Sequence, residues 1–147
     1  MLYLESGVLP ARFAIKRMKL VFLRYILTQE ENSLIKTFLM AQKIDPKKGD
    51  WYSEVRDILK EYDIQMSDEE IKKMPENIFK SFVKKQTYSV SLYYLQSKQR
   101  KGEKAHNIIY ESMKLQDYLN SCSNLKLEEQ RNIFSLRSRM NELKTNF

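Results

Sequence analysis

The chain has 147 residues, a net charge of +7 and only three glycines and three prolines. This length suits one domain with a modest core, and the many charged helix-forming residues favour an all-α fold over a sheet. No apolar run approaches the roughly 20 residues that span a bilayer, and no signal peptide is apparent. The single cysteine excludes an internal disulfide. Together these features predict an intracellular protein without a membrane contact, and they do not distinguish nucleus from cytoplasm.

The first predicted helix covers residues 10–28, because proline is favoured in the first turn and no Gly, Pro or Asp follows before Glu30. At about 100° per residue, its apolar side chains form a broad face and a narrower seam. The seam consists of Phe13, Leu20 and Leu27. We expect the broad face to join the core and a neighbouring module to cover the seam, so that the isolated chain associates through it. The broad face consists of Ala14, Ile15, Met18, Val21, Phe22, Tyr25 and Ile26.

Basic side chains separate these two apolar groups. Arg12, Lys16 and Lys19 form one ridge, and Arg17 and Arg24 form the other. A simple surface helix has one apolar stripe and a back of mixed charge. Two cationic edges on a packed helix indicate contact with a polyanion, so these five residues are candidates for binding nucleic acid.

Caps and helix breakers define the next elements. Asn32 or Ser33 caps a second helix, which ends before Pro46. Asp50 is a good N-cap for a third helix. The apolar residues spaced for one face of the second helix are Leu34, Ile35, Phe38 and Leu39. Those of the third helix are Trp51, Val55, Ile58, Leu59 and Tyr62.

The second half of the chain begins with a short helix, for which Ser67 and Glu70 form a capping box. The longest predicted helix starts at Pro75 and stops near Lys101, because Gly102 follows. A short helical stretch is expected over residues 110–119 and a last helix over residues 127–144. The whole is predicted to be an irregular bundle of about six helices in a single domain, residues 1–147.

Charge is unevenly distributed along this bundle. Residues 1–28 carry five basic and one acidic side chain, and residues 75–114 carry eight and three. Residues 29–74, between them, carry eight basic and eleven acidic side chains. This pattern indicates nucleic acid contacted along selected elements, although excess lysine can also serve solubility alone. The further candidate contacts are Lys98, Arg100 and Lys101 at the end of the longest helix, Lys104 in the loop that follows it, and Arg137 and Arg139 in the last helix.

Residues that could support catalysis have simpler structural interpretations. The acidic run at residues 67–70 suits the first turn of a helix, where the macrodipole stabilises negative charge. His106 and Cys122 are the only residues of their types and cannot form a zinc site alone. The sequence contains no glycine-rich phosphate loop or nucleophile motif. We therefore expect no enzymatic activity, cofactor, metal site or small-molecule substrate.

Several segments also carry a family resemblance. The string LYLESGVLP at residues 2–10 is followed by Arg12-Phe13, by Arg17 and by the sequence YIL at residues 25–27. Shorter echoes occur at residues 40–42, 50–51, 67–70 and 136–140. In this order they resemble the region after the polymerase core of LINE-type (non-LTR) retrotransposon reverse transcriptases, in the branch with a zinc knuckle and a restriction-like endonuclease.

The resemblance implies that residues 1–28 form a thumb-like basic segment and residues 29–147 a set of connector helices. It also implies a parent protein that is an RNA-directed DNA polymerase. The chain itself has no Asp-Asp dipeptide to hold two metal ions, no cluster of cysteines and no Pro-Asp pair. The implied function is therefore non-catalytic. The connector would hold an RNA or DNA template–primer duplex by its phosphates and join the polymerase and nuclease modules.

Two alternatives remain open from the sequence. The chain could be a free-standing module that docks on a protein through its apolar faces, with basic edges that only solubilise it. It could also be a small helical DNA-binding protein that derives from such an element and acts alone.

Overall fold

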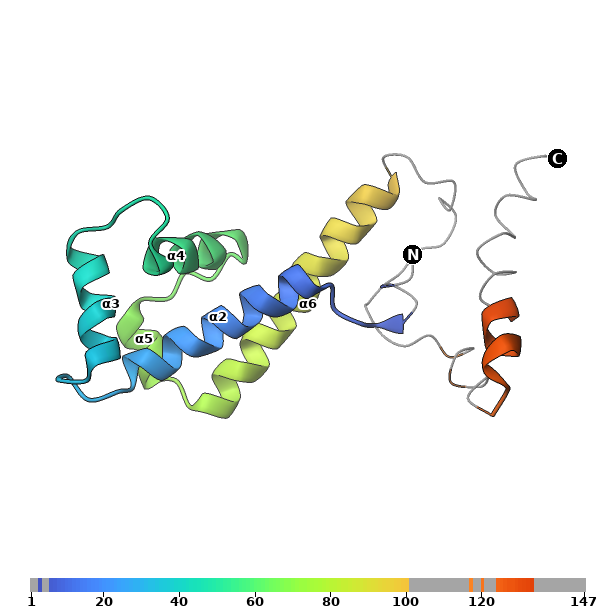
Figure 1. Cartoon of the computed structure of the whole chain (residues 1–147), viewed down its shortest axis with the longest axis horizontal. Helices are drawn as coiled ribbons and strands as arrows, with labels where there is room; N and C mark the ends of the chain where they lie inside the picture. The colour runs from blue at the N-terminus through green and yellow to red at the C-terminus, as the bar shows by residue number, and fades with distance from the viewer. Residues whose placement is uncertain (1–2, 4–5, 101–116, 118–119, 121–123, 134–147) are drawn as a thin grey trace. The chain divides into compact units, whose positions relative to one another are not determined.

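The computed structural model describes residues 3, 6–100, 117, 120 and 124–133. Their fold is all-α, as predicted, and no strand occurs in these ranges (Figure 1). The chain divides into two compact units, one formed by Ala11–Thr87 and the other by Met1–Pro10 together with Tyr88–Phe147.

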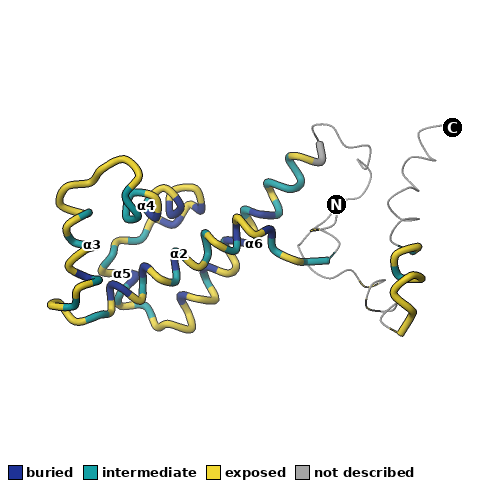
Figure 2. Tube along the Cα trace, in the orientation of Figure 1, coloured by how far each residue is buried: buried dark blue, intermediate teal, exposed yellow. Residues whose placement is uncertain are grey.

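The unit Ala11–Thr87 contains α2 (Ala11–Leu27), α3 (Leu34–Ile44), α4 (Trp51–Glu61), α5 (Asp68–Lys73) and the first half of α6 (Glu76–Arg100). Helix α2 packs against α3, α4 and α5 (Figure 1). Figure 2 shows that the buried positions of this unit are shared among its helices. Helix α2 is therefore the element around which the unit is organised.

Local sequence signals set the helix boundaries. Ser33 is the N-cap of α3, and its hydroxyl accepts a hydrogen bond from the backbone N–H of Lys36. Ser67 and Glu70 form the predicted capping box at α5. Asp50 occupies the N-cap position of α4, but its carboxylate accepts the backbone N–H of Lys47 at 2.8 Å and leaves the helix without a side-chain cap. The predicted starts of all three helices are confirmed.

A reversal of the backbone after α4 directs one more side chain into the core. Asp63 has a φ of 52°, in the left-handed region that usually requires glycine. The N–H of Ile64 donates to the carbonyl of Leu59 at 2.8 Å, and that of Asp63 donates to Lys60 at 3.0 Å. These two bonds are those of a Schellman motif. The reversal buries Ile64, which is 5% exposed.

The prediction for the faces of α2 is wrong. The seam is buried, and Leu23, which was not assigned to it, joins it at 0% exposure. Of the expected core face only Ile26 is buried, whereas Met18 is 66% exposed. Helix α2 thus turns the predicted core face outward. The physical reason is that Leu23 and Ile26 widen the seam into a full apolar face, which α3, α4 and α5 cover.

The predicted face of α3 is also only partly correct. Leu39 is buried, but Leu34 and Phe38 are 75% and 64% exposed. Lys36 is buried in their place, and its ammonium donates to the carbonyl of Gln29 at 3.1 Å and to the Glu31 carboxylate. The hydrogen bond from Lys36 lowers the pKa of Glu31 below its usual value. A charged partner thus allows a lysine to enter the position that an apolar residue was expected to fill.

In the other unit, the second half of α6 carries two adjacent tyrosines with different exposure. Tyr93 is 76% exposed, whereas Tyr94 is partly buried, with the ammonium of Lys98 at 5.1 Å from its ring centre. Residues 127–133 are helical, as predicted. His106 and Cys122 lie outside the described residues, as does most of the stretch at 110–119.

A buried hydroxyl in the core makes stability sensitive to high pH. Tyr62 is 1% exposed, its hydroxyl has no hydrogen-bond partner that meets normal geometry, and the Thr87 hydroxyl donates instead to the Val83 carbonyl at 2.7 Å. Burial raises the pKa of Tyr62 to about 12, and the nearby Thr87 offsets a smaller part of this increase.

We expect the free energy of unfolding to fall between about pH 10, where the unfolded tyrosine ionises, and about pH 12. The folded state retains the proton across this window, so each step upward in pH favours the unfolded state. Tyr62→Phe should remove on the order of 2 kcal/mol of that loss and leave stability at pH 7 equal or higher, because no buried donor is left unpaired. Urea titrations of both proteins at several pH values measure this, and identical pH profiles would contradict it.

Candidate functional site

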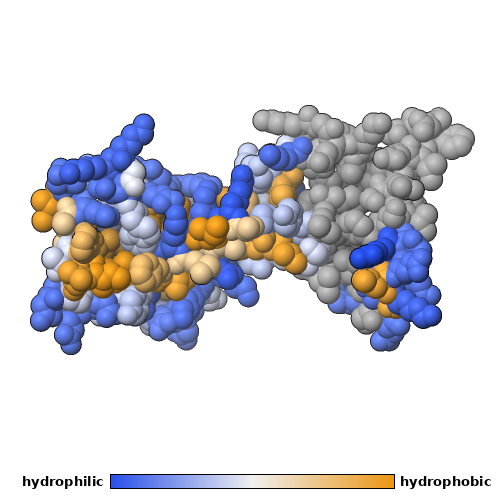
Figure 3. Space-filling view, in the orientation of Figure 1, coloured by the Kyte–Doolittle hydropathy of each residue, from blue (hydrophilic) through white to orange (hydrophobic). Residues whose placement is uncertain are grey.

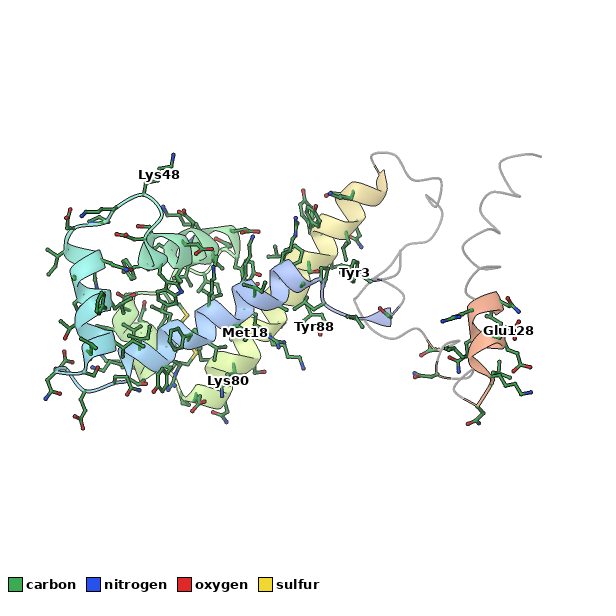
Figure 4. The ribbon with its side chains drawn as sticks, viewed as in Figure 1. Tyr3, Met18, Lys48, Lys80, Tyr88 and Glu128 are labelled. Atoms are coloured by element: carbon green, nitrogen blue, oxygen red, sulfur yellow. The ribbon has the colours of Figure 1, made fainter. Side chains whose placement is uncertain are left out.

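An open groove of about 1040 Å³ lies between α2 and the first half of α6. All of its lining residues belong to the unit Ala11–Thr87. Figure 4 labels Met18 on α2 and Lys80 on α6, one residue from each wall. The groove could therefore receive a partner. Its lining is formed by Ile15, Arg17, Met18, Lys19, Val21, Phe22, Arg24, Tyr25, Thr28, Glu76, Phe79, Lys80 and Lys84.

One wall of the groove is an apolar band on the outer face of α2. Ile15, Met18, Phe22 and Tyr25 are 53%, 66%, 43% and 52% exposed. Figure 3 shows hydrophobic residues gathered along this helix on the face toward the viewer. The rings of Phe22 and Tyr25 stack at 5.8 Å, and Phe22 meets Trp51 of α4 edge-on at 5.7 Å. We call these four exposed residues of α2 the outer band.

The predicted cationic ridge facing α4 is neutralised by carboxylates of that helix. The ammonium of Lys16 forms an ion pair with Glu61, and that of Lys19 forms one with Glu54. Both lysines are partly buried. Arg12, the third member of the ridge, places its guanidinium 4.6 Å from the centre of the Phe13 ring. This ridge therefore fastens α2 to α4 and presents less free charge than its sequence indicates.

The opposite ridge faces α6 and retains more of its charge. Arg24 donates from Nε and Nη2 to the carbonyl of Met74 at 3.1 and 2.9 Å, which caps the end of α5. Arg17 makes no ion pair or hydrogen bond with any residue that the structure describes. It is therefore the α2 cation best placed to meet an external anion.

Helix α6 adds two cations that the sequence reasoning missed. Lys80 and Lys84 line the groove one turn apart, and both are exposed. Lys80 pairs with Glu76 at the start of the same helix, and this pair lowers the pKa of Glu76. Lys84 has no such partner within the described ranges. A lysine repeat at i and i+4 was the available signal, but only the fold places it beside α2.

The other predicted nucleic-acid contacts are not among the described residues that line this groove. Lys98 belongs to the other unit, where it lies over Tyr94. Arg100 ends α6, and only its backbone is described. Lys101, Lys104, Arg137 and Arg139 lie outside the described residues.

The acidic residues at the start of α5 have a structural role. The Asp68 carboxylate accepts from Lys43 at 2.8 Å and from the hydroxyl of Tyr52 at 3.1 Å, with Arg56 at 3.9 Å. The hydrogen bond to Asp68 raises the pKa of Lys43, and burial together with Asp68 raises that of Tyr52. Glu70 is held by Ser67, which lowers its pKa. These contacts join α3, α4 and α5. Within the described ranges no three His, Cys, Asp or Glu side chains are grouped to hold a metal ion.

Comparisons with models of protein families, with curated proteins and with solved structures find no match to this chain. None of the helices in the described part of the chain is both long and apolar enough to cross a membrane.

Proposed function

We propose that this chain is a non-catalytic helical connector, which joins other parts of a larger assembly by docking them in the groove between α2 and α6. The observation that carries the proposal is the outer band, whose four large apolar side chains are 43–66% exposed on a helix that is otherwise well packed. Contiguous exposed apolar surface on a folded domain marks a site of association.

The resemblance to the connector of LINE-type reverse transcriptases supports a more specific form of this proposal. In that arrangement the docked partners are the neighbouring polymerase and nuclease modules of the same polypeptide. The genomic sequence on both sides of the reading frame tests it. A polymerase Asp-Asp motif upstream and a Cys/His knuckle downstream would support the placement, and flanking regions that encode neither would contradict it.

Docking also predicts how the full chain behaves alone. At about 0.1 M salt, repulsion between the basic groove edges should keep copies apart, whereas at about 1 M salt the Debye length shrinks to about 3 Å and association should increase. Sedimentation velocity at both salt concentrations measures this. Ile15→Gln with Met18→Gln should suppress the association and preserve the helical circular dichroism spectrum. A chain that stays monomeric at both salt concentrations would contradict an exposed docking surface.

A second candidate function is binding to the phosphates of a nucleic acid duplex, including a template–primer. Its specific support is that Arg17 of α2 and Lys80 and Lys84 of α6 line the same groove from its two walls. Phosphate contacts need cations but no base-reading motif.

A further inference from the structure

We propose that the groove between α2 and α6 receives an acidic amphipathic helix of a partner protein. This inference rests on the docking function proposed above and specifies the chemistry of the partner. Three features support it: the spacing of the outer band, the shape of the groove and the charge along its edges.

The outer band has the spacing of a helix–helix seam. Ile15, Met18, Phe22 and Tyr25 follow one another at intervals of three, four and three residues. This is the a/d spacing at which one helix packs along another. At 1.5 Å per residue the band extends for about 15 Å, or close to three helical turns. A partner helix laid along α2 can therefore bury successive side chains against all four positions.

The groove supplies a second wall for such a helix. Its volume of about 1040 Å³ is bounded by α2 on one side and by α6 on the other, where the buried Phe79 forms part of the lining. A segment seated there contacts two helices at once, as in the helix-in-groove mode of peptide recognition. A small molecule would leave most of the outer band in water.

The charge of the groove lining indicates which sign of charge a partner helix should carry. The groove is lined by one carboxylate, Glu76, and by the cations Arg17, Lys19, Arg24, Lys80 and Lys84. Two of these cations are paired, Lys19 with Glu54 and Lys80 with Glu76. The edges therefore remain positive, and Glu or Asp beside the apolar positions of a partner helix would meet opposite charge. Complementary charge across an interface favours the correct partner and rejects like-charged ones.

The same charge argues against two other occupants. A second copy of this chain would bring its own basic edges against those of the first, which is unfavourable at low salt. A nucleic acid would satisfy the cations but would leave Ile15 and Met18 uncovered.

A peptide titration of the full chain tests the proposal. The probe is a labelled synthetic helix of about 21 residues, with leucine at a and d and glutamate at e and g. A matched peptide carries lysine in place of every glutamate, and fluorescence anisotropy measures both. We expect the acidic peptide to bind at least about tenfold more tightly, a difference of about 1.4 kcal/mol. Ile15→Gln with Met18→Gln should weaken its binding about tenfold or more.

The chain offers a matched control for charge. Lys84 lines the groove, whereas the adjacent Lys85, which is also exposed, does not. Lys84→Gln should lower the affinity for the acidic peptide several-fold, and Lys85→Gln should leave that affinity unchanged. Circular dichroism spectra that match the parent chain establish that each variant is folded.

The possible binding results distinguish failure of the acidic partner from failure of the docking function. Equal binding of the lysine peptide would overturn the acidic partner and leave the docking function intact. If neither peptide binds and the chain shows no salt-driven association, both proposals fail. A single-stranded oligonucleotide that binds the parent chain but not the Ile15→Gln, Met18→Gln variant, with no binding of the acidic peptide, would assign the groove to nucleic acid and overturn this inference.

Discussion

Leu20→Ala should lower the free energy of unfolding by about 2–5 kcal/mol, because it removes a fully buried side chain and leaves a cavity. Met18→Ala, two residues earlier on the same helix, should change the free energy of unfolding by no more than about 0.5 kcal/mol. Met18 is 66% exposed, and alanine is a strong helix former. The total stability of a domain is about 5–15 kcal/mol, so Leu20→Ala removes a large share of it.

Urea denaturation followed by circular dichroism measures this pair of variants. The pair tests directly which face of α2 lies in the core. Phe13→Ala, at 0% exposure, is a second core variant and should cost about 3–5 kcal/mol. If Met18→Ala were the more damaging change, the outer band would be the packed face, and the groove would lose its meaning as a docking surface.

Binding to a nucleic acid duplex, if it occurs, should depend strongly on salt and on the cations of the groove. Each phosphate contact contributes about −0.9 to the slope of log affinity against log salt. Arg17→Gln with Lys84→Gln should therefore reduce that slope by about two units. Lys16→Gln with Lys19→Gln should change it little, because both lysines already pair with carboxylates of α4.

The two double variants carry the same change of net charge, so a general electrostatic effect would lower affinity equally in both. Filter binding of a labelled duplex between about 0.05 and 0.2 M salt measures the slopes. Equal effects would contradict a site at the groove. A lack of binding at the lowest salt concentration would remove nucleic acid as a partner of the whole chain.

Helix boundaries were predictable because the signals that set them are local. The Ser67–Glu70 capping box and the Ser33 cap act within one turn, so their outcome does not depend on the rest of the fold. The all-α class follows in the same way from composition and the scarcity of glycine and proline.

The orientation of α2 was not predictable in this way, because both of its sides are apolar. The choice between them depends on which side α3, α4 and α5 cover, and that is a property of the assembled unit. Leu23 was the missing signal: with it, the seam becomes wide enough to form a core face. The pairing of Lys16 and Lys19 was unpredictable for a similar reason. Their partners, Glu61 and Glu54, lie on α4 and come close to α2 only in the folded unit.

The edge-on contact between Phe22 and Trp51 gives the protein an optical reporter of its own. Trp51 is the only tryptophan in the chain, and the ring that it touches belongs to the outer band. Indole emission shifts to shorter wavelength when water around the ring is replaced by apolar groups. A helix that settles over Phe22 should therefore shift the emission of Trp51 without any attached dye. Excitation of this single residue would report the occupied fraction of the groove in real time, even in a mixture with tryptophan-free partners.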